Sequence, residues 1–312
     1  MRIVFLGTPE FAVPTLERAF EAGHEIAAVV TQPDRPKGRG RMLSAPPVKE
    51  TALRLGLTVH QPERIRTPEA IELLRSLKPE AMVVVGYGKI IPQAAIDIPR
   101  HGIVNVHASL LPHYRGAAPV QWAIARGETV TGVTTMRIDA GLDTGDILLQ
   151  RETAIGAEET AVEVGQRLAA MGADLLVGTL AGLERGEIVP RPQNSAEATF
   201  APVLKKDDGR IDWTRPAAEI ANHIRGFKPW PGCYAHVRGK AIEILRARAG
   251  GSAAGEPGSV HPVRGRLVVT CGDGTALEIL EVQMEGRKRM DAAAFQNGYH
   301  LMENELLREI NQ

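Results

Sequence analysis

Short apolar runs alternate with amphipathic stretches along the first half of the chain. The strand-sized runs are RIVFL, EIAAVV, TVH, AMVVV and GIVNVH, and β-branched residues are frequent in them. Between them, the stretches FAVPTLERAFEAG, VKETALRLG and PEAIELLRSL carry apolar residues at helical spacing. Apolar, β-branched runs separated by helices are typical of a parallel sheet that is covered on both faces. The pattern therefore predicts an α/β fold built on a Rossmann-like parallel sheet.

The pattern changes after the stretch QWAIARGE. A pair of strands, VTGVTTMRI and GDILLQRE, is predicted around the loop DAGLDT, and a long helix from about Thr160 to Glu184 follows. Further along lie the runs CYAHV, KAIEILRA, GSVHPV, RLVVTC and ALEILEVQ, which turn sequences separate. Several short strands with turns between them predict a small β-barrel, and we expect an OB-like one.

The chain of 312 residues is long enough for two domains of ordinary size. We expect a first domain at residues 1–189, a linker at 190–208 and the OB-like domain at 209–312. The linker is rich in Pro, Ser and charged residues and has no apolar periodicity, which is typical of a segment between domains.

Composition and charge narrow the class of protein. The chain has 37 basic and 37 acidic residues and a formal net charge of 0, so a nucleic acid must be met by a local basic patch. Its longest apolar runs are far shorter than a membrane span, and its N-terminus lacks the apolar segment of a signal peptide. We therefore expect a cytoplasmic protein that does not bind membranes. Cys233 and Cys271 lack metal-ligand spacing and are expected to be free thiols.

Polar residues alternate at the end of the run GIVNVHAS. Asn105, His107 and Ser109 are each two residues apart, so their side chains are predicted on one face of an extended segment. In sheets of this kind, ligands bind outside the carboxyl ends of the strands, where AMVVVGYG would also place Tyr87. The first strand is followed by GTPEFA, with one glycine where a dinucleotide fingerprint needs three, so the crevice is predicted to hold another ligand.

These residue types fit one kind of chemistry. The imidazole of His107 can act as a general acid or base, and the amide of Asn105 can donate to an oxyanion. A carboxylate such as Asp143, in GLDTGD, would orient the imidazole. Ser109 lacks the Gly-x-Ser-x-Gly elbow of a hydrolase, so the trio fits direct acyl transfer, in which the acceptor itself attacks. Ordinary structural roles at a strand end and in two turns remain an alternative.

Several motifs resemble those of a known family. The stretches NVHASLLPHYRGAAPVQW, GLDTGDI, FLGTPEFA and TQPDRPKGRG together resemble the methionyl-tRNA formyltransferases, within the wider group that uses 10-formyltetrahydrofolate. The likeness covers the whole chain, including LKKDDGRIDW and FKPWPG. The Asn-x-His-x-Ser-Leu-Leu-Pro core is shared with other folate-dependent formyltransferases and hydrolases, so it implies the chemistry. The basic loop, the complete GLDTGD and the C-terminal domain imply the acceptor.

The resemblance implies a role for each matching residue. It implies Asn105, His107 and Asp143 as the catalytic trio, without a metal. The residues expected to bind the folate are Ser109, Leu110, Leu111, Pro112, Val84, Val85, Gly86 and Tyr87. The co-substrate implied is 10-formyltetrahydrofolate, whose formyl group passes to the α-amino group of initiator methionyl-tRNA. The product is N-formylmethionyl-tRNA for translation initiation, and we expect the enzyme to be a monomer.

Two basic segments are candidates for contact with the tRNA. The residues concerned are Arg35, Lys37, Arg39, Arg41, Lys205 and Lys206. The resemblance implies that the first segment inserts near the end of the acceptor stem, with Arg39 as the matching arginine. A solvated surface loop explains the same charges without a partner. The aromatic residues of FKPWPG, Phe227 and Trp230, are predicted to form a rigid entry into the second domain rather than a base-stacking platform.

Three other functions are compatible with parts of the sequence. A formyltransferase that acts on a sugar-nucleotide or purine-precursor amine would use the same trio, but a small acceptor needs no basic loop. A folate hydrolase would use water in place of the amine and release formate. An RNA-binding module with a decayed Rossmann domain is the alternative outside the enzymes, and the intact trio argues against it.

Overall fold

The protein was analysed as a computed structural model that describes residues 1–37, 42–263 and 265–307. The chain forms two compact units, each assembled from more than one segment. The first consists of Met1–Pro119, Val130–Thr153 and Gly165–Ala201, and the second of Val120–Thr129, Ala154–Val164 and Pro202–Gln312. The domain boundaries expected at residues 189 and 208 stay a prediction.

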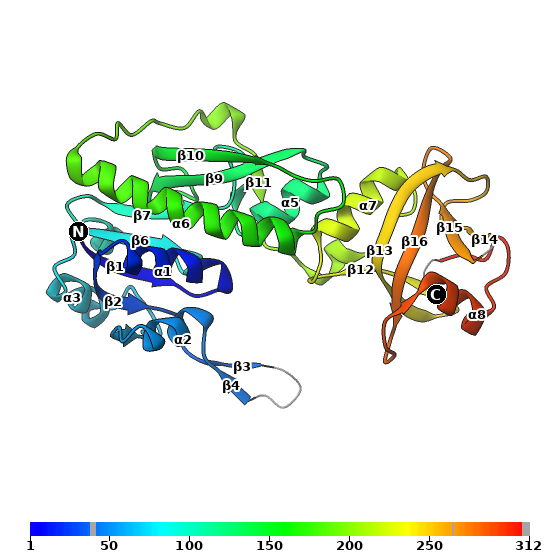
Figure 1. Ribbon diagram of the computed structural model, residues 1–312, viewed down its shortest axis with the longest axis horizontal. Helices are drawn as coiled ribbons and strands as arrows, with labels where there is room; N and C mark the ends of the chain where they lie inside the picture. The colour runs from blue at the N-terminus through cyan, green and yellow to red at the C-terminus, as the bar shows by residue number, and fades with distance from the viewer. Residues whose placement is uncertain (38–41, 264, 308–312) are drawn as a thin grey trace. The chain divides into compact units, whose positions relative to one another are not determined.

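The first unit is built on a seven-stranded sheet with the order β10-β9-β7-β6-β1-β2-β5 (Figure 1). Its strands are β1 (Arg2–Gly7), β2 (Glu25–Val30), β5 (Val59–His60), β6 (Ala81–Val85), β7 (Ile103–His107), β9 (Val130–Arg137) and β10 (Ile147–Ala154). Five neighbouring strands, in the order β7, β6, β1, β2 and β5, pair in parallel, which confirms the predicted Rossmann-like sheet. β9 pairs with β7 in the antiparallel direction and makes the sheet a mixed one.

The helices α1 (Val13–Glu21), α2 (Pro47–Arg54), α3 (Pro68–Ser76) and α6 (Ala161–Arg185) lie where the sequence predicts them. The helices α4 (Gln93–Ile96) and α5 (Pro119–Ala125) were not predicted, and α5 belongs to the second unit from Val120 onward. The 3₁₀ turns η1 (Glu10–Ala12) and η2 (Ser195–Glu197) complete the helical elements described up to residue 201. The local sequence defines the N-terminus of α3, because the side chain of Thr67 accepts a hydrogen bond from Ala70 N and Pro68 occupies the first turn. The long α6 confirms the helix predicted at about residues 160–184.

The packing of α6 decides which way the residues of β7 face. A Cβ atom added at Gly172 of α6 would lie 2.8 Å from Val106 Cγ1, so the helix packs closely on the Val106 side of the sheet. Successive residues of a strand face opposite sides. Asn105 and His107 therefore face away from α6.

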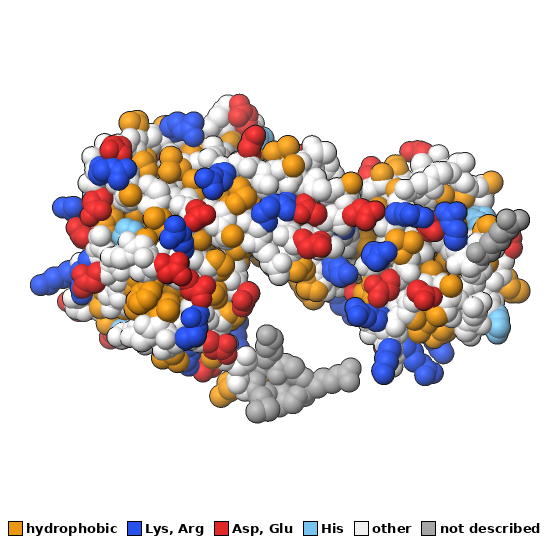
Figure 2. Space-filling model, in the orientation of Figure 1, with side chains coloured by type: hydrophobic (Ala, Val, Ile, Leu, Met, Phe, Trp, Pro, Cys, Tyr) orange, Lys and Arg blue, Asp and Glu red, His pale blue; other side chains and the backbone are white. Residues whose placement is uncertain are grey.

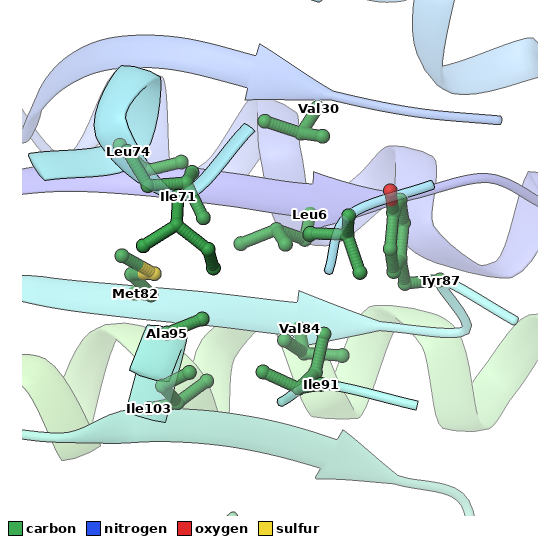
Figure 3. Close-up of a cluster of buried hydrophobic side chains, with 12 residues drawn as sticks. Leu6, Val30, Ile71, Leu74, Met82, Val84, Tyr87, Ile91, Ala95 and Ile103 are labelled. Carbon is green, nitrogen blue, oxygen red and sulfur yellow. The ribbon is translucent and has the colours of Figure 1, made fainter. Parts of the chain in front are cut away.

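The opposite face of the sheet carries a hydrophobic cluster. Val84 of β6, Ile103 of β7 and the ring of Tyr87 belong to it, as Figure 3 shows. Burial raises the pKa of Tyr87 to about 12. Asn105 and His107 follow Ile103 at two-residue steps, so they continue this face toward the carboxyl end of β7. β7 therefore carries an amide and an imidazole on the same face as the apolar cluster, at its carboxyl end.

Two short strand pairs complete the first unit. β3 (Arg35–Lys37) pairs with β4 (Met42–Ser44) in the antiparallel direction. β8 (Arg115–Gly116) pairs in parallel with β11 (Phe200–Ala201). The second pair brings part of the expected linker back onto the first unit. We call residues 193–201 the strap.

The second unit contains an antiparallel sheet with the order β12-β13-β16-β15-β14, and β17 pairs with β16. Its strands are β12 (Cys233–Val237), β13 (Lys240–Ser252), β14 (Val260–Val263), β15 (Arg266–Thr270), β16 (Thr275–Met284) and β17 (Met290–Asp291). Register shifts interrupt the pairing of the long β13 with β16, and such bulges bend a strand. The OB-like β domain is confirmed, whereas η3 (Lys206–Gly209), α7 (Ala217–Gly226) and α8 (Ala292–Tyr299) were not predicted.

A carboxylate on β16 links two arginines of neighbouring strands. Glu278, only 7% exposed, accepts hydrogen bonds from Arg248 Nε at 2.7 Å and from Arg266 Nε at 2.7 Å. These bonds, first the one from Arg266, lower the pKa of Glu278 below its usual 4.5. A carboxyl group whose pKa is lower in the folded state stabilises that state above its unfolded pKa.

We expect Glu278→Gln to lower the free energy of unfolding at pH 7 by about 1–2 kcal/mol, because both arginines lose their charged acceptor. The difference from the wild type should shrink as the pH falls below about 4.5, where the carboxyl group of the unfolded chain takes up a proton. Urea unfolding at several pH values measures it. Glu281→Gln on the same strand is the control, since its partner Arg289 lies 3.8 Å away and is 77% exposed. Equal losses in the two variants would contradict the prediction.

Candidate active site

The carboxyl end of β7 places two buried polar side chains next to β6. Asn105 is 9% exposed and His107 is 6% exposed. Asn105 lies in register with Val84 of β6 and with Met136 of β9. The structure therefore brings the Asn-x-His pair together with the start of the segment at residues 84–87, as the crevice hypothesis expects.

The side-chain amide of Asn105 is free to bind a ligand. It makes no hydrogen bond to any part of the chain that the structure describes. Its polar atoms also remain accessible, since the fully buried side-chain atoms without a partner belong to other residues. A donor held at a strand end without a protein partner suits a ligand oxygen.

His107 is oriented through both of its ring nitrogens. Its Nε2 lies 3.0 Å from the carbonyl oxygen of Tyr114. Since a carbonyl oxygen only accepts, Nε2 carries the hydrogen and donates it. Nδ1 faces the carboxylate of Asp143, with 3.7 Å to Oδ2. That separation is longer than a hydrogen bond, as is common for catalytic pairs without substrate.

Asp143 reaches His107 only because its loop folds back. β9 is antiparallel to β7, and Arg137 at its end lies beside Val104, near the start of β7. The loop between β9 and β10 must return along the strand for Asp143 to approach His107. Asp143 has a φ of 51°, a left-handed conformation that asparagine and aspartate tolerate better than most residues.

Hydrogen bonds shape this loop. Oδ2 of Asp143 accepts from the backbone N–H of Gly116 at 2.8 Å. Within the loop, Asp139 Oδ1 accepts from Gly141 N at 3.0 Å and from Thr144 Oγ1 at 2.7 Å. The structure therefore brings the predicted trio into one place, and its catalytic role stays a hypothesis.

Ser109 does not continue the face of Asn105 and His107, because β7 ends at His107. Its hydroxyl donates to the carbonyl oxygen of His113 at 2.6 Å and so forms part of a turn. The alternation therefore placed the first two polar residues correctly and the third wrongly. Leu111 packs with Met136 in a small core cluster, while Leu110 and Pro112 are half-buried. Their assignment to a folate pocket stays a prediction.

The segment at residues 84–87 leaves β6 at the same end of the sheet. Val84 and Val85 are its last strand residues, and Gly86, with a φ of 56°, turns the chain. The carbonyl oxygen of Tyr87 accepts from Thr8 Oγ1 at 3.2 Å and from Gln32 Nε2 at 3.1 Å. These contacts fix the backbone that the resemblance assigns to the pterin, and that assignment stays a prediction.

The strap adds residues that the sequence analysis missed. The side chain of Gln193 donates from Nε2 to the carbonyl oxygens of Asp143 at 2.8 Å and of Gly145 at 2.7 Å. Its Oε1 accepts from Arg115 Nε at 3.0 Å and Nη2 at 2.7 Å. Arg115, which the sequence left without a role, is 4% exposed. Gln193 thus joins the Asp143 loop to the segment that follows β7.

Backbone contacts of the strap hold the same segment. Thr199 accepts from Tyr114 N through Oγ1 and from Arg115 N through its carbonyl oxygen, both at 2.9 Å. Gly116 has a φ of 121°, and a Cβ atom there would lie 2.6 Å from the carbonyl oxygen of Ala201. The strap therefore fixes the residues whose backbone contacts His107 and Asp143. No periodic signal in the expected linker pointed to this role.

The first basic segment is described only in part. Arg35 and Lys37 lie on β3, and the side chain of Arg35 is exposed. Arg39 and Arg41 lie outside the described residues. The role of all four in binding tRNA stays a prediction.

The second basic segment lies at η3. Lys205 and Lys206 are exposed there. Their role in binding tRNA stays a prediction.

The two aromatic residues of the FKPWPG motif differ in burial. Phe227 is fully buried, with its ring edge-to-face on Trp122 at 5.2 Å between centroids. Phe227 is therefore structural, as predicted, whereas Trp230 is 54% exposed.

The described ranges 1–37, 42–263 and 265–307 contain no group of three or more His, Cys, Asp and Glu that could hold a metal ion. Cys233 and Cys271 are free and buried, and burial raises the pKa of each thiol to about 12, which makes them unreactive. No helix in these ranges is long and apolar enough to cross a membrane.

Comparison with known proteins defines the class to which this fold and site belong. A family model described as "Formyl transferase" matches residues 1–180, and one described as "Formyl transferase, C-terminal domain" matches residues 203–300. The chain belongs to the formyl transferase family.

Two solved structures illustrate the fold. The sugar 3N-formyl transferase WlaRD, crystallised with dTDP and 5-N-formyl-THF, is similar with a TM-score of 0.68 and 18% identity, over 92% of this chain and 99% of that one. An N-formyltransferase from Helicobacter canadensis, in complex with folinic acid and dTDP-3-aminofucose, has a TM-score of 0.67 and 17% identity, over 90% and 98%. At these identities the likeness shows the fold alone.

Closer relatives narrow the family. The methionyl-tRNA formyltransferase of Solibacter usitatus is 62% identical over 310 residues, which is 99% of each chain. That of Koribacter versatilis is 58% identical over 300 residues, or 96% of each chain. Within the formyl transferases, the chain is a member of the methionyl-tRNA formyltransferases, and the family predicted from its motifs is confirmed.

Proposed function

We propose that the protein transfers the formyl group of 10-formyltetrahydrofolate to the α-amino group of methionyl-initiator tRNA. The product is N-formylmethionyl-tRNA, and the place of action is the cytoplasm, where this tRNA is used. The observation that carries the proposal is the unpartnered amide of Asn105 beside the His107–Asp143 pair. The names of the full-length relatives support the acceptor, and 5-N-formyl-THF in a structure of the same fold supports a formyl folate as donor.

Asn105 and His107 act on the oxygen of the formyl group. The folate supplies a formyl group that is activated because N10 can leave. The amide of Asn105 donates to the formyl oxygen, which becomes negative as the amine attacks. His107 keeps its Nε2 proton on the carbonyl oxygen of Tyr114, so a second proton on Nδ1 lies on the side of Asp143. In this protonated form His107 stabilises the same negative charge.

Asp143 accepts the proton that the attacking amine loses. Its Oδ2 is held by Gly116 N, while Oδ1 accepts no hydrogen bond from residues 1–37, 42–263 or 265–307. Oδ1 is therefore the base that takes the proton as the amine nitrogen bonds to the formyl carbon. The bond from that carbon to N10 then breaks, and N10 takes the electron pair and a proton.

Apolar surface next to the trio suits the folate ring. Leu142, which precedes Asp143, is 62% exposed. Together with the backbone of residues 84–87 and 109–112, it supports the proposal that the pterin binds beside the catalytic loop.

A formylation assay with four acceptor conditions tests the proposed function. The enzyme is given 10-formyltetrahydrofolate with initiator methionyl-tRNA, with free methionine, with an amino-sugar nucleotide, or without acceptor. We expect rapid formylation of the tRNA alone. Preference for the sugar amine would indicate a sugar formyltransferase, and formate release without acceptor would indicate a hydrolase. Absence of any folate-dependent turnover would leave a non-catalytic RNA-binding protein.

Local basic residues must attract the tRNA, because the chain as a whole has no net charge. On the face seen in Figure 2, basic and acidic side chains are intermingled over the described surface. The segment from Arg35 to Arg41 holds four cations within seven residues. We therefore propose that it contacts the acceptor end of the tRNA.

We expect Arg39→Ala to weaken the binding of methionyl-tRNA by about 1–2 kcal/mol, or roughly tenfold. The slope of log affinity against log salt concentration should fall by about 1, because one phosphate contact is lost. Fluorescence titration at several salt concentrations measures both. Arg75→Ala, at an exposed arginine of α3, is the control and should leave the affinity unchanged. Unchanged affinity in Arg39→Ala would remove this residue from the interface.

A further inference from the structure

Gln193 connects the two segments that contact His107. One segment contains Tyr114 and Gly116, whose backbone atoms bond to His107 and Asp143. The other is the loop that carries Asp143. Between them lies Gln193 of the strap, 50 residues from Asp143 and 78 from Arg115 in the sequence.

The hydrogen bonds of Gln193 fix the orientation of its amide. Arg115 only donates, through Nε and Nη2, so the amide oxygen must face it. The carbonyl oxygens of Asp143 and Gly145 only accept, so the amide nitrogen must face them. The side chain of Gln193 thus makes four hydrogen bonds, and their donors and acceptors allow only one orientation of its amide.

This arrangement bears on the position of the Asp143 carboxylate. The loop has to fold back along β7, and Asp143 adopts a left-handed φ of 51° to do so. The two donations from Gln193 Nε2 hold the carbonyl groups on either side of Thr144 in that turn. A carboxylate on a short side chain follows its backbone, so the turn sets where Asp143 lies relative to His107.

We propose that Gln193 is a positioning residue for formyl transfer, which acts through Asp143 and does not touch the substrate. Its amide nitrogen holds the Asp143 loop, and Arg115 holds the amide. The inference rests on the proposed function, since formyl transfer is the reaction to be measured. It assigns a role in the reaction to the strap, a segment that belongs to neither the strand nor the loop of the trio.

The substitution Gln193→Glu separates the two halves of the amide. It keeps an oxygen acceptor for Arg115, but it replaces the donor nitrogen by a second oxygen facing the carbonyl groups of Asp143 and Gly145. A displacement of about 1 Å at a reacting group can cost about 100-fold in rate. We expect kcat to fall by about 10- to 100-fold, while KM for the folate and for the tRNA changes by less than about threefold.

Four further variants complete the test, the single Asp143→Asn among them, with kcat and KM measured for each. Gln193→Ala removes both halves of the amide. Asn194→Ala is the matched control, since this exposed amide bonds only within the strap, to Ala196 N and Glu197 Oε1. Gln193→Glu combined with Asp143→Asn forms a double-mutant cycle with the two single variants, which measures whether the residues act as one unit. Thermal unfolding of each variant shows whether the fold is retained.

The expected result is a loss in Gln193→Glu that nearly disappears, to less than about twofold, when Asp143 is already Asn. Asn194→Ala should match the wild type. Wild-type kcat in folded Gln193→Glu and Gln193→Ala would overturn the inference, and so would a full additional loss in the Asp143→Asn background. Failure of the wild type itself to formylate methionyl-tRNA would instead contradict the proposed function, so the two failures are distinguishable.

Discussion

We expect replacement of His107 by alanine to lower kcat for formyl transfer by about 10²- to 10⁴-fold, the usual contribution of a positioned acid or base. The imidazole is 6% exposed and is oriented by Tyr114 on one side and faces Asp143 on the other. A side chain held in this way places its positive charge at a fixed position, and alanine carries none. Single-turnover measurement with both substrates saturating isolates this step from binding.

A histidine at the other end of the same strand provides the control. His101 precedes β7, and its Nε2 accepts a hydrogen bond from Arg100. We expect His101→Ala to keep kcat within about twofold of the wild type. Near-normal turnover in a folded His107→Ala variant would remove His107 from the mechanism. Similar losses in both variants would point to damage to β7 in place of lost chemistry.

Replacement of Asn105 by alanine should separate activity from stability. We expect kcat to fall by about 10²- to 10³-fold, as for the loss of one oxyanion donor. The free energy of unfolding should change little, because an accessible amide without a protein partner contributes little to the fold. Parallel kinetic assays and urea unfolding measure the two effects.

Asn105→Asp sharpens this second prediction, because it keeps the size of the side chain and removes the donor. We expect its loss of kcat to be at least as large as that of Asn105→Ala, since a carboxylate would face the developing oxyanion. A stability loss of several kcal/mol in Asn105→Ala, with modest loss of kcat, would show instead that the amide holds the strand end.

Local sequence predicts the strand side of this site well. The run GIVNVH is β-branched and apolar, so its place in a buried strand and the common face of Asn105 and His107 follow from a two-residue period. The prediction for Ser109 was wrong because the two-residue period ends with the strand at His107. In the turn that follows, the hydroxyl of Ser109 donates to a backbone carbonyl oxygen. A local pattern does not say where a strand stops.

Contacts between distant segments could not be predicted from such local patterns. The approach of Asp143 to His107 depends on the antiparallel direction of β9 and on a loop that folds back, and family resemblance, not spacing, pointed to it. Gln193 lies in a polar segment without periodicity, so the sequence indicated only a linker there. Its partners lie 50 and 78 residues away, and only the folded chain shows them.

The position of the strap in the chain has a consequence for biosynthesis. Ala201, whose carbonyl oxygen accepts from Ala117 N, is the last strap residue, and the ribosome makes it well after Asp143. At roughly 5–20 residues per second, the chain between Asp143 and Ala201 takes about 3–12 s to synthesise. Until the strap has been synthesised, its residues cannot hold the catalytic loop. The contacts that position the catalytic loop can therefore form only late in the synthesis of the first unit.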